Sequence, residues 1–344
     1  MILKRTFPIV FLIAFLSACV KDGSKSSDKV LPTSSGKYGE VLVVVDSTYE
    51  NRKTGAVLET IFFKGVEGLP QKEPMFRMST VAPRDFKSIL KRSRNLVRIT
   101  IADHRESQIK VESDVWAKDQ LLIQLFAPND EEAARILEKN KQNIRDYFNE
   151  KEIERLQAQF SIKPNKDIAK QILKRFDVSI VIPPAFVMMD TSGNGLWLQK
   201  QKQVGEHEIL QGIMIYEVPY TSDSTFSSNE MILSRDYFTK SHIQGVRDSS
   251  YMTVYRDYKL MPKEINLNGK YAVEYRGLWN MKNDFMGGPF VHYTIVDEKR
   301  NRVLHIDGFV YAPKFNKREY VRELDAILQT FETARGSHYF NSGS

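Results

Sequence analysis

Apolar and polar residues alternate one by one in the carboxy-terminal third of this 344-residue chain. The clearest alternation lies at residues 289–297 and 303–311. Successive side chains of a β-strand point to opposite faces of a sheet, so a period of two residues is typical of a strand with one buried face. Only a short connection separates the two segments, which indicates an antiparallel pair. The pattern therefore constrains this part of the chain to an antiparallel sheet.

The requirement that the apolar residues of both segments share one face fixes their predicted register. In that register His292 lies opposite Asp307, and His305 falls diagonally beside them. The same reasoning applied to residues 271–279 places Arg276 on this polar face. Side chains of these types can together bind an anion, hold a metal or perform acid and base chemistry, so the set is a possible binding site. Cross-strand charge pairs also stabilise ordinary sheets, and we favour that interpretation.

A second possible binding site surrounds the glycine pair at residues 287–288. Glycine allows a ligand to approach the backbone closely. The apolar side chains that crowd this segment are Trp279, Phe285, Met286 and Phe290. If they were exposed together, they would form the kind of patch that marks a partner site. An ordinary turn is the favoured alternative.

The amino terminus predicts export. Lys4 and Arg5 precede an apolar run at residues 7–16 that is too short to span a bilayer, so residues 1–18 read as a signal peptide. The run ends in Leu-Ser-Ala-Cys, which resembles a lipobox. Cys19 is the only cysteine in the chain, and we expect it to carry diacylglycerol and palmitate after cleavage. Val20 replaces the aspartate of an inner-membrane retention signal, which favours the outer membrane, on its periplasmic or its surface face.

Residues 20–36, which follow the predicted lipidated cysteine, are rich in small polar residues and are expected to be a flexible tether. Cleavage removes two of the 50 basic residues, leaving a small excess over 43 acidic ones. Because these charges are interleaved, we expect no nucleic-acid partner. With Cys19 acylated, no free thiol is left to bind metal, and we expect neither a metal site nor a cofactor.

The remaining residues predict an α+β fold of two antiparallel-sheet domains with helices packed on them, at residues 37–163 and 164–344. In the first, strands are expected at 39–45, 76–81, 96–101 and 120–127, and helices at 51–63, 85–94 and about 130–160. The last helix is expected to pack on its own sheet rather than in a coiled coil. In the second, strands are expected at 179–182, 185–190, 196–200, 209–218, 251–255, 271–279, 289–297 and 303–311, and helices at 167–176, 229–240 and 317–331.

Four phrases of the sequence carry a family resemblance, at residues 116–120, 276–279, 286–290 and 308–313. They resemble the Bacteroidetes lipoprotein family catalogued as domain of unknown function 4837, and the resemblance extends over nearly all of the chain after residue 18. It implies no activity. The second half is also similar to the Mog1 and PsbP type of fold, whose members tend to be accessory or assembly subunits. Fold likeness alone says little about function.

The remaining polar motifs give weaker signals. The sequence Asp-Thr-Ser-Gly at residues 190–193 is similar to an aspartic-protease motif, but the extra serine and the following Asn194 and Gly195 favour a hairpin turn. The other histidines have no ligand-like spacing, and we assign them no role; they are His104, His207, His242 and His338.

We therefore expect a non-enzymatic envelope lipoprotein that binds another envelope component or supports its assembly. The first alternative is a hydrolase that uses the face of Arg276, His292 and Asp307, which would require this face to line a pocket rather than lie under a helix. The second is a glycan-binding or small-molecule-binding protein, which would expose several aromatic residues along one groove.

Overall fold

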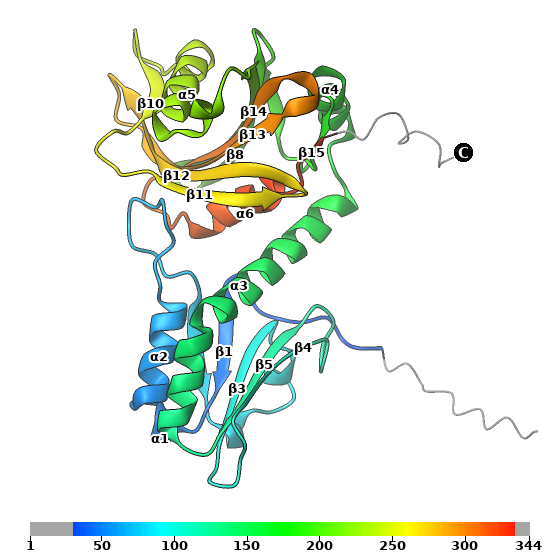
Figure 1. Cartoon of the computed structure of the whole chain (residues 1–344), viewed down its shortest axis with the longest axis vertical. Helices are drawn as coiled ribbons and strands as arrows, with labels where there is room; N and C mark the ends of the chain where they lie inside the picture. The colour runs from blue at the N-terminus through cyan, green and yellow to red at the C-terminus, as the bar shows by residue number, and fades with distance from the viewer. Residues whose placement is uncertain (1–29, 334–344) are drawn as a thin grey trace, which may run out of the picture. The chain divides into compact units, whose positions relative to one another are not determined.

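The computed structural model describes residues 30–333 (Figure 1). The predicted signal peptide and Cys19 lie outside the described residues. These residues form separate β-sheets with helices packed on them, an α+β fold, which confirms the predicted class. The first sheet lies between residues 40 and 127, and the second lies between residues 187 and 311.

The amino-terminal sheet has the strand order β2-β1-β3-β5-β4. Its strands are β1 (Glu40–Val44), β2 (Arg77–Val81), β3 (Asn95–Ile101), β4 (Gln108–Ser113) and β5 (Leu121–Ala127). All neighbours are parallel except β4 and β5, so the antiparallel sheet predicted for this half is wrong. The connections explain the difference. The chain between β1 and β2 is long enough to return over the sheet and includes a helix, as a parallel pair requires.

The helical elements of this half are α1 (Ser47–Glu50), α2 (Lys53–Phe62), the 3₁₀ turns η1 (Pro83–Asp85) and η2 (Leu90–Arg92), and α3 (Asp130–Ile162). The two short turns replace the helix predicted at residues 85–94. Helix α3 begins where expected, and the side chain of Asn129 caps it by accepting a hydrogen bond from the Glu132 amide at 2.9 Å. Leu137, Ile144 and Phe148 pack into the core of the sheet, as predicted.

The last residues of the predicted tether are already part of the fold of this half. Ser34 N donates to Lys118 O, and Ser35 N donates to Arg92 O, at 3.1 and 2.8 Å. Residues 34 and 35 are therefore held to the first half by backbone hydrogen bonds, although the tether was predicted to continue to residue 36.

The carboxy-terminal half is built on an antiparallel sheet of eight strands in the order β10-β12-β13-β14-β9-β8-β7, with β11 also paired to β12. The strands are β7 (Val187–Asp190), β8 (Gly195–Val204), β9 (His207–Pro219), β10 (Tyr251–Val254), β11 (Met261–Leu267), β12 (Lys270–Lys282), β13 (Gly287–Asp297) and β14 (Arg302–Tyr311). The antiparallel prediction is confirmed here. Strand β11 was not predicted. A short two-stranded sheet joins β6 (Val178–Ser179) and β15 (Glu332–Thr333).

Helices cover both faces of this sheet (Figure 1). On one face, α4 (Lys166–Phe176) and α6 (Arg318–Leu328) pack against a core that includes Tyr293 and Ile306. On the other face, the 3₁₀ turn η3 (Asp223–Phe226) and α5 (Ser228–His242) pack against a core that includes Tyr216 and Tyr275. A last 3₁₀ turn, η4 (Glu298–Arg300), joins β13 to β14. The side chains of the central strands are therefore buried on both faces of the sheet.

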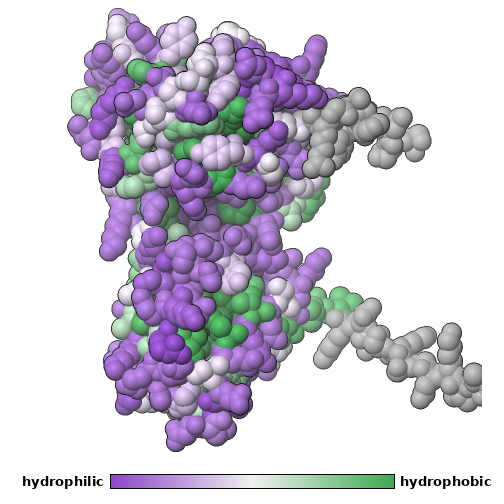
Figure 2. Space-filling view, in the orientation of Figure 1, coloured by the Kyte–Doolittle hydropathy of each residue, from purple (hydrophilic) through white to green (hydrophobic). Residues whose placement is uncertain are grey.

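Polar residues dominate the face of the molecule shown in Figure 2, and apolar residues appear there as separate patches. None of the helices in residues 30–333 combines the length and the apolar character that a membrane span requires. The largest apolar cores of the described residues lie on the amino-terminal sheet and on each face of the carboxy-terminal sheet.

Candidate functional site

The predicted register of β13 and β14 is confirmed. His292 lies opposite Asp307, and Thr294 lies opposite His305. The placement of Arg276 in the same row is wrong, because Arg276 lies opposite Val291 and His292 lies opposite Tyr275. Arg276 therefore lies on the other face of the sheet.

The side chain of Arg276 is held by carboxylates on that other face. Its Nε lies 2.6 Å from Glu274 Oε1, and its Nη2 lies 2.8 Å from Asp325 Oδ1 on α6. The error arose because alternation identifies a face only when one side of a strand is exposed. In β12 both sides are covered, so Val273 and Tyr275 belong to one core and the neighbours of Arg276 to another.

The cation that pairs with Asp307 is Arg235 of α5, which the sequence reasoning missed. Arg235 Nε lies 2.8 Å from Asp307 Oδ2, and Nη2 lies 3.3 Å from Oδ1; both side chains are 0% exposed. A signal existed in the sequence. Arg235 stands four residues after Met231 and three before Phe238, between two apolar residues on the same helix face.

The two histidines continue this buried network. His292 Nδ1 lies 3.0 Å from Asp307 Oδ2, and His292 Nε2 lies 3.0 Å from His305 Nδ1. Desolvation lowers the pKa of His292 and lowers that of His305 well below the usual value, so both rings are neutral at pH 7. Arg235 and His292 hold the pKa of Asp307 below its usual range despite burial. The network thus carries one positive and one negative charge under α5.

The proposed aromatic patch around the glycine pair does not form. Trp279 and Phe290 are only 2% and 1% exposed, whereas Phe285 is 90% exposed. Gly288 allows two strands to pack closely rather than a ligand to approach. A Cβ there would lie 1.9 Å from Val310 O, so glycine is required by the neighbouring strand.

The Asp-Thr-Ser-Gly segment forms part of a turn between β7 and β8. Asp190 Oδ2 lies 2.7 Å from His242 Nδ1, and Ser192 Oγ lies 3.4 Å from the same nitrogen. A hydrolytic triad would place its serine and its carboxylate on different ring nitrogens. This cluster therefore joins the turn to the end of α5, and it gives His242 the structural contact that the sequence did not indicate.

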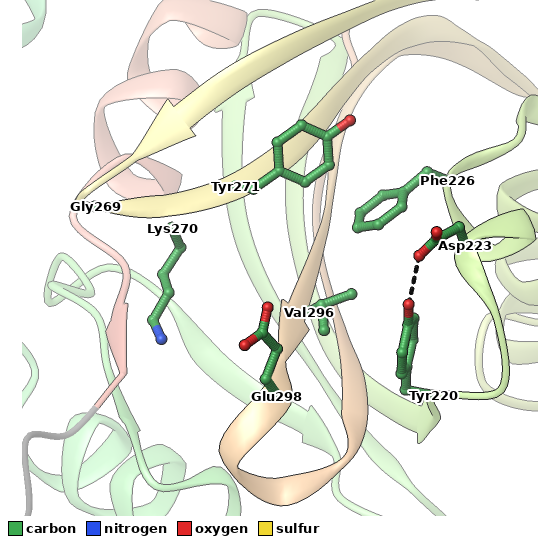
Figure 3. Close-up of a pocket in the computed structure, with 8 residues that line it drawn as sticks. All are labelled: Tyr220, Asp223, Phe226, Gly269, Lys270, Tyr271, Val296 and Glu298. Carbon is green, nitrogen blue, oxygen red and sulfur yellow. Dashed lines mark hydrogen bonds between the residues drawn. The ribbon is translucent and has the colours of Figure 1, made fainter.

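A hollow of about 800 Å³ opens beside η3 and between the ends of β12 and β13 (Figure 3). Figure 3 shows charged and aromatic side chains around it, from three separate segments of the chain. The side chains that line it are Tyr220, Asp223, Phe226, Lys270, Tyr271, Val296 and Glu298. None of them was predicted as a site residue. We call this hollow the aromatic pocket.

Two aromatic side chains make a wall of the aromatic pocket. Phe226 and Tyr271 meet edge to face, with their ring centroids 5.0 Å apart and their planes at 85°. Tyr271 is 51% exposed, and the hydroxyl of Tyr220 donates to Asp223. Lys270 and Glu298 add one charge of each sign. Aromatic faces beside fixed polar groups are typical of sites for small polar ligands that also have apolar surfaces.

Among residues 30–333, no group of histidine, aspartate and glutamate side chains has an arrangement that suits a metal ion. His292, His305 and Asp307 are close together, but both ring nitrogens of His292 and the carboxylate are already hydrogen-bonded within the network.

Two family models match separate parts of the chain. The model described as Domain of unknown function (DUF4837) matches residues 165–330. The model described as Domain of unknown function (DUF8532) matches residues 34–161. The predicted resemblance to domain of unknown function 4837 is therefore confirmed for the carboxy-terminal half, while the phrase at residues 116–120 lies in the part matched by the other model. No curated protein matches the chain significantly.

Similar solved structures include a variant of the protein Mog1 and the Saccharomyces cerevisiae Ran-binding protein Mog1p. The first is 11% identical over 47% of this chain and 93% of that chain, with a TM-score of 0.31. The second is 12% identical over 47% of this chain and 92% of that chain, with a TM-score of 0.31. Similarity at this level carries no information about function.

Proposed function

We propose that this chain is a cell-envelope lipoprotein of the Bacteroidetes type whose carboxy-terminal half binds a glycan or a similar small polar molecule in the aromatic pocket. Cys19 carries the lipid anchor, in the outer membrane. The observation that supports binding is that exposed Tyr271 and the partly exposed Tyr220 and Phe226 line one hollow, since aromatic residues along a groove were expected of a glycan-binding protein. The hydrolase that used Arg276, His292 and Asp307 together loses its support, because these residues do not share a face.

The chemistry of the aromatic pocket suits a sugar. A sugar ring has apolar C–H faces and hydroxyl edges, and the half-exposed ring of Tyr271 offers a flat surface for the former. Asp223 and Glu298 accept hydrogen bonds from hydroxyl groups, whereas Lys270 donates them. The volume of about 800 Å³ lies within the range of roughly 300–1,000 Å³ that small-molecule sites occupy. The hollow is therefore large enough for a small saccharide.

Binding is tested by titrating a panel of soluble neutral oligosaccharides into the full chain and following the tyrosine and aromatic proton resonances. Tyr271→Ala should weaken binding of any positive member at least about tenfold, since aromatic hot-spot residues contribute about 2 kcal/mol or more. Tyr255→Ala is the matched control, because Tyr255 is 39% exposed and lies outside this pocket. Equal affinity of both variants, or no binding by any member, would contradict the proposal.

The anchor is tested separately. Metabolic labelling with a palmitate analogue should mark the native chain, and Cys19→Ser should abolish the label and either release the mature chain or leave an uncleaved precursor. Unchanged labelling of Cys19→Ser would refute the anchor without affecting the pocket.

A further inference from the structure

A second and smaller cavity, of about 240 Å³, lies beside α5 and shares a wall with the aromatic pocket. The segment at residues 219–226 forms that wall. Tyr220 and Phe226 line the aromatic pocket, whereas Thr221 and Ser224 line the smaller cavity. Ser234 of α5 and His305 of β14 also line the smaller cavity, so the buried histidine network ends at its surface.

Asp307 fixes the direction of each hydrogen bond in this network. Its carboxylate is paired with Arg235 and can only accept, so His292 Nδ1 must donate to it. The ring of His292 is neutral, which leaves its Nε2 as an acceptor for His305 Nδ1. The other nitrogen of His305 therefore carries a lone pair. Ser234 Oγ lies 3.3 Å from this Nε2 and donates its proton to it.

Two further groups complete the arrangement. Thr294 Oγ1 lies 3.4 Å from His305 Nδ1 and is a weaker competitor for the proton that His292 accepts. Tyr216 lines the cavity and stacks on His305, with ring centroids 4.7 Å apart and an angle of 19° between the planes. The Tyr216 hydroxyl is buried beside Ser234 and makes no well-formed hydrogen bond among the described residues. A buried hydroxyl without an acceptor is costly, and a ligand oxygen bound next to Ser234 would supply one.

We propose that the smaller cavity is a site for the hydrolysis of short-chain carboxylic esters, in which Ser234 is the nucleophile, His305 the general base and Tyr216 the donor to the developing oxyanion. Arg235, His292 and Asp307 are positioning residues. The site does not depend on ligand binding in the aromatic pocket. Its volume lies below the range of drug-sized pockets, roughly 300–1,000 Å³, which selects small acyl groups.

The reaction balances with water as the second substrate. Ser234 Oγ forms a bond to the carbonyl carbon while its proton moves to His305 Nε2. The carbonyl electrons move to oxygen, where the Tyr216 hydroxyl donates to the negative charge. The bond to the alcohol oxygen then breaks, and that oxygen takes the proton from His305. Water attacks the acyl-serine in the same way, which releases the carboxylic acid and returns the proton to Ser234.

The first test is labelling of the full chain with a fluorophosphonate, followed by peptide mass spectrometry. The label is expected on Ser234 and should disappear in Ser234→Ala. Ser241→Ala is the matched control, since Ser241 lies on the same helix and its Oγ donates to Tyr237 O, away from His305. It should leave labelling unchanged. A folded native chain that is not labelled on Ser234 overturns the proposal.

The second test uses hydrolysis of 4-nitrophenyl acetate. Ser234→Ala should reduce the rate to the background, and a rate equal to the native one refutes the role of Ser234. Tyr216→Phe keeps the stacked ring and removes only the hydroxyl, so kcat should fall about 100-fold with little change in KM, as for the loss of one oxyanion donor. An unchanged kcat in folded Tyr216→Phe refutes that role. In Asp307→Asn, a moved pH profile of kcat/KM supports positioning of the histidines, and an unmoved profile contradicts it.

Discussion

Asp307 of β14 and Arg235 of α5 form an ion pair in which both side chains are completely buried and Arg235 Nε lies 2.8 Å from the carboxylate. The pair joins the helix to the sheet, and the ring of Phe290 lies 4.2 Å from the guanidinium. Removing one partner of a buried pair leaves the other charge without compensation. Asp307→Asn should therefore lower the free energy of unfolding by about 3–5 kcal/mol, as measured by urea denaturation.

A double variant separates the charge from the packing. Replacing both partners with apolar residues of similar size, as in Arg235→Met with Asp307→Leu, removes the unpaired charge. This protein should be more stable than Asp307→Asn, although His292 loses an acceptor. If the double variant is the less stable of the two, the uncompensated buried charge is not the main cause of the stability that Asp307→Asn loses.

The dependence of stability on pH follows from the buried histidines. Their pKa values are lowered in the folded chain from an ordinary value of 6.5, so the unfolded chain binds more protons below pH 6.5. Their contribution is complete above pH 6.5 and is lost as the pH falls. Asp325 has the opposite effect, because burial raises its pKa to about 6 and the folded state takes up its proton first.

The two effects can be separated in Asp325→Asn, which removes the opposing titration. Between about pH 7.5 and 5, its free energy of unfolding should fall more steeply than that of the native chain. Urea denaturation at several pH values measures both slopes. Equal slopes would show that Asp325 does not titrate in this range, and a shallower slope in the variant would reverse the assigned sign.

The sequence was most informative where local rules decide the structure. The cap at Asn129 and the acidic first turn predict the start of α3, and alternation with a short turn predicts the pairing of His292 with Asp307. It failed for Arg276, because a strand that is covered on both faces has no polar side from which to count. Sheet direction in the first half failed for a related reason, since direction depends on how the chain returns between strands.

The functional groups brought together by folding were harder to foresee. Arg235 reaches Asp307 across 72 positions in the sequence, and only its position between two apolar residues on one helix face marked it. The aromatic pocket combines residues from the connection after β9, the start of β12 and the end of β13. Phe226 and Tyr271 meet because η3 lies beside the start of β12 in the folded chain. No local motif records such a meeting.

Arg276 offers a test of the corrected sheet face. In Arg276→Gln the carboxylates of Glu274 and Asp325 lose the cation between them, so their pKa values should rise and both should resist ionisation. The loss of stability should be about 3–5 kcal/mol near pH 8 and smaller near pH 5, where protonation removes the repulsion. Lys282→Gln, at an exposed position of the same strand, should change stability by less than about 0.5 kcal/mol at either pH. A loss that is independent of pH would contradict the assigned contacts.

Gly288 gives the most direct test of close packing between strands. The indole Nε1 of Trp279 donates to Val310 O at 3.2 Å across the place that a side chain at residue 288 would occupy. A Cβ there would lie 1.9 Å from that oxygen. Because the oxygen belongs to the backbone of β14, it could move away only if β14 separated from β13. Gly288→Ala should therefore destabilise the chain by at least about 3 kcal/mol, the upper range for overpacking.

Gly205→Asn is the matched control, because nothing lies within 4 Å of a Cβ there and asparagine tolerates its φ of +60°. Thermal unfolding followed by circular dichroism should show a large decrease in Tm for Gly288→Ala and a small one for Gly205→Asn. Equal decreases in the two variants would show that β13 and β14 are not packed as closely as their backbone positions indicate.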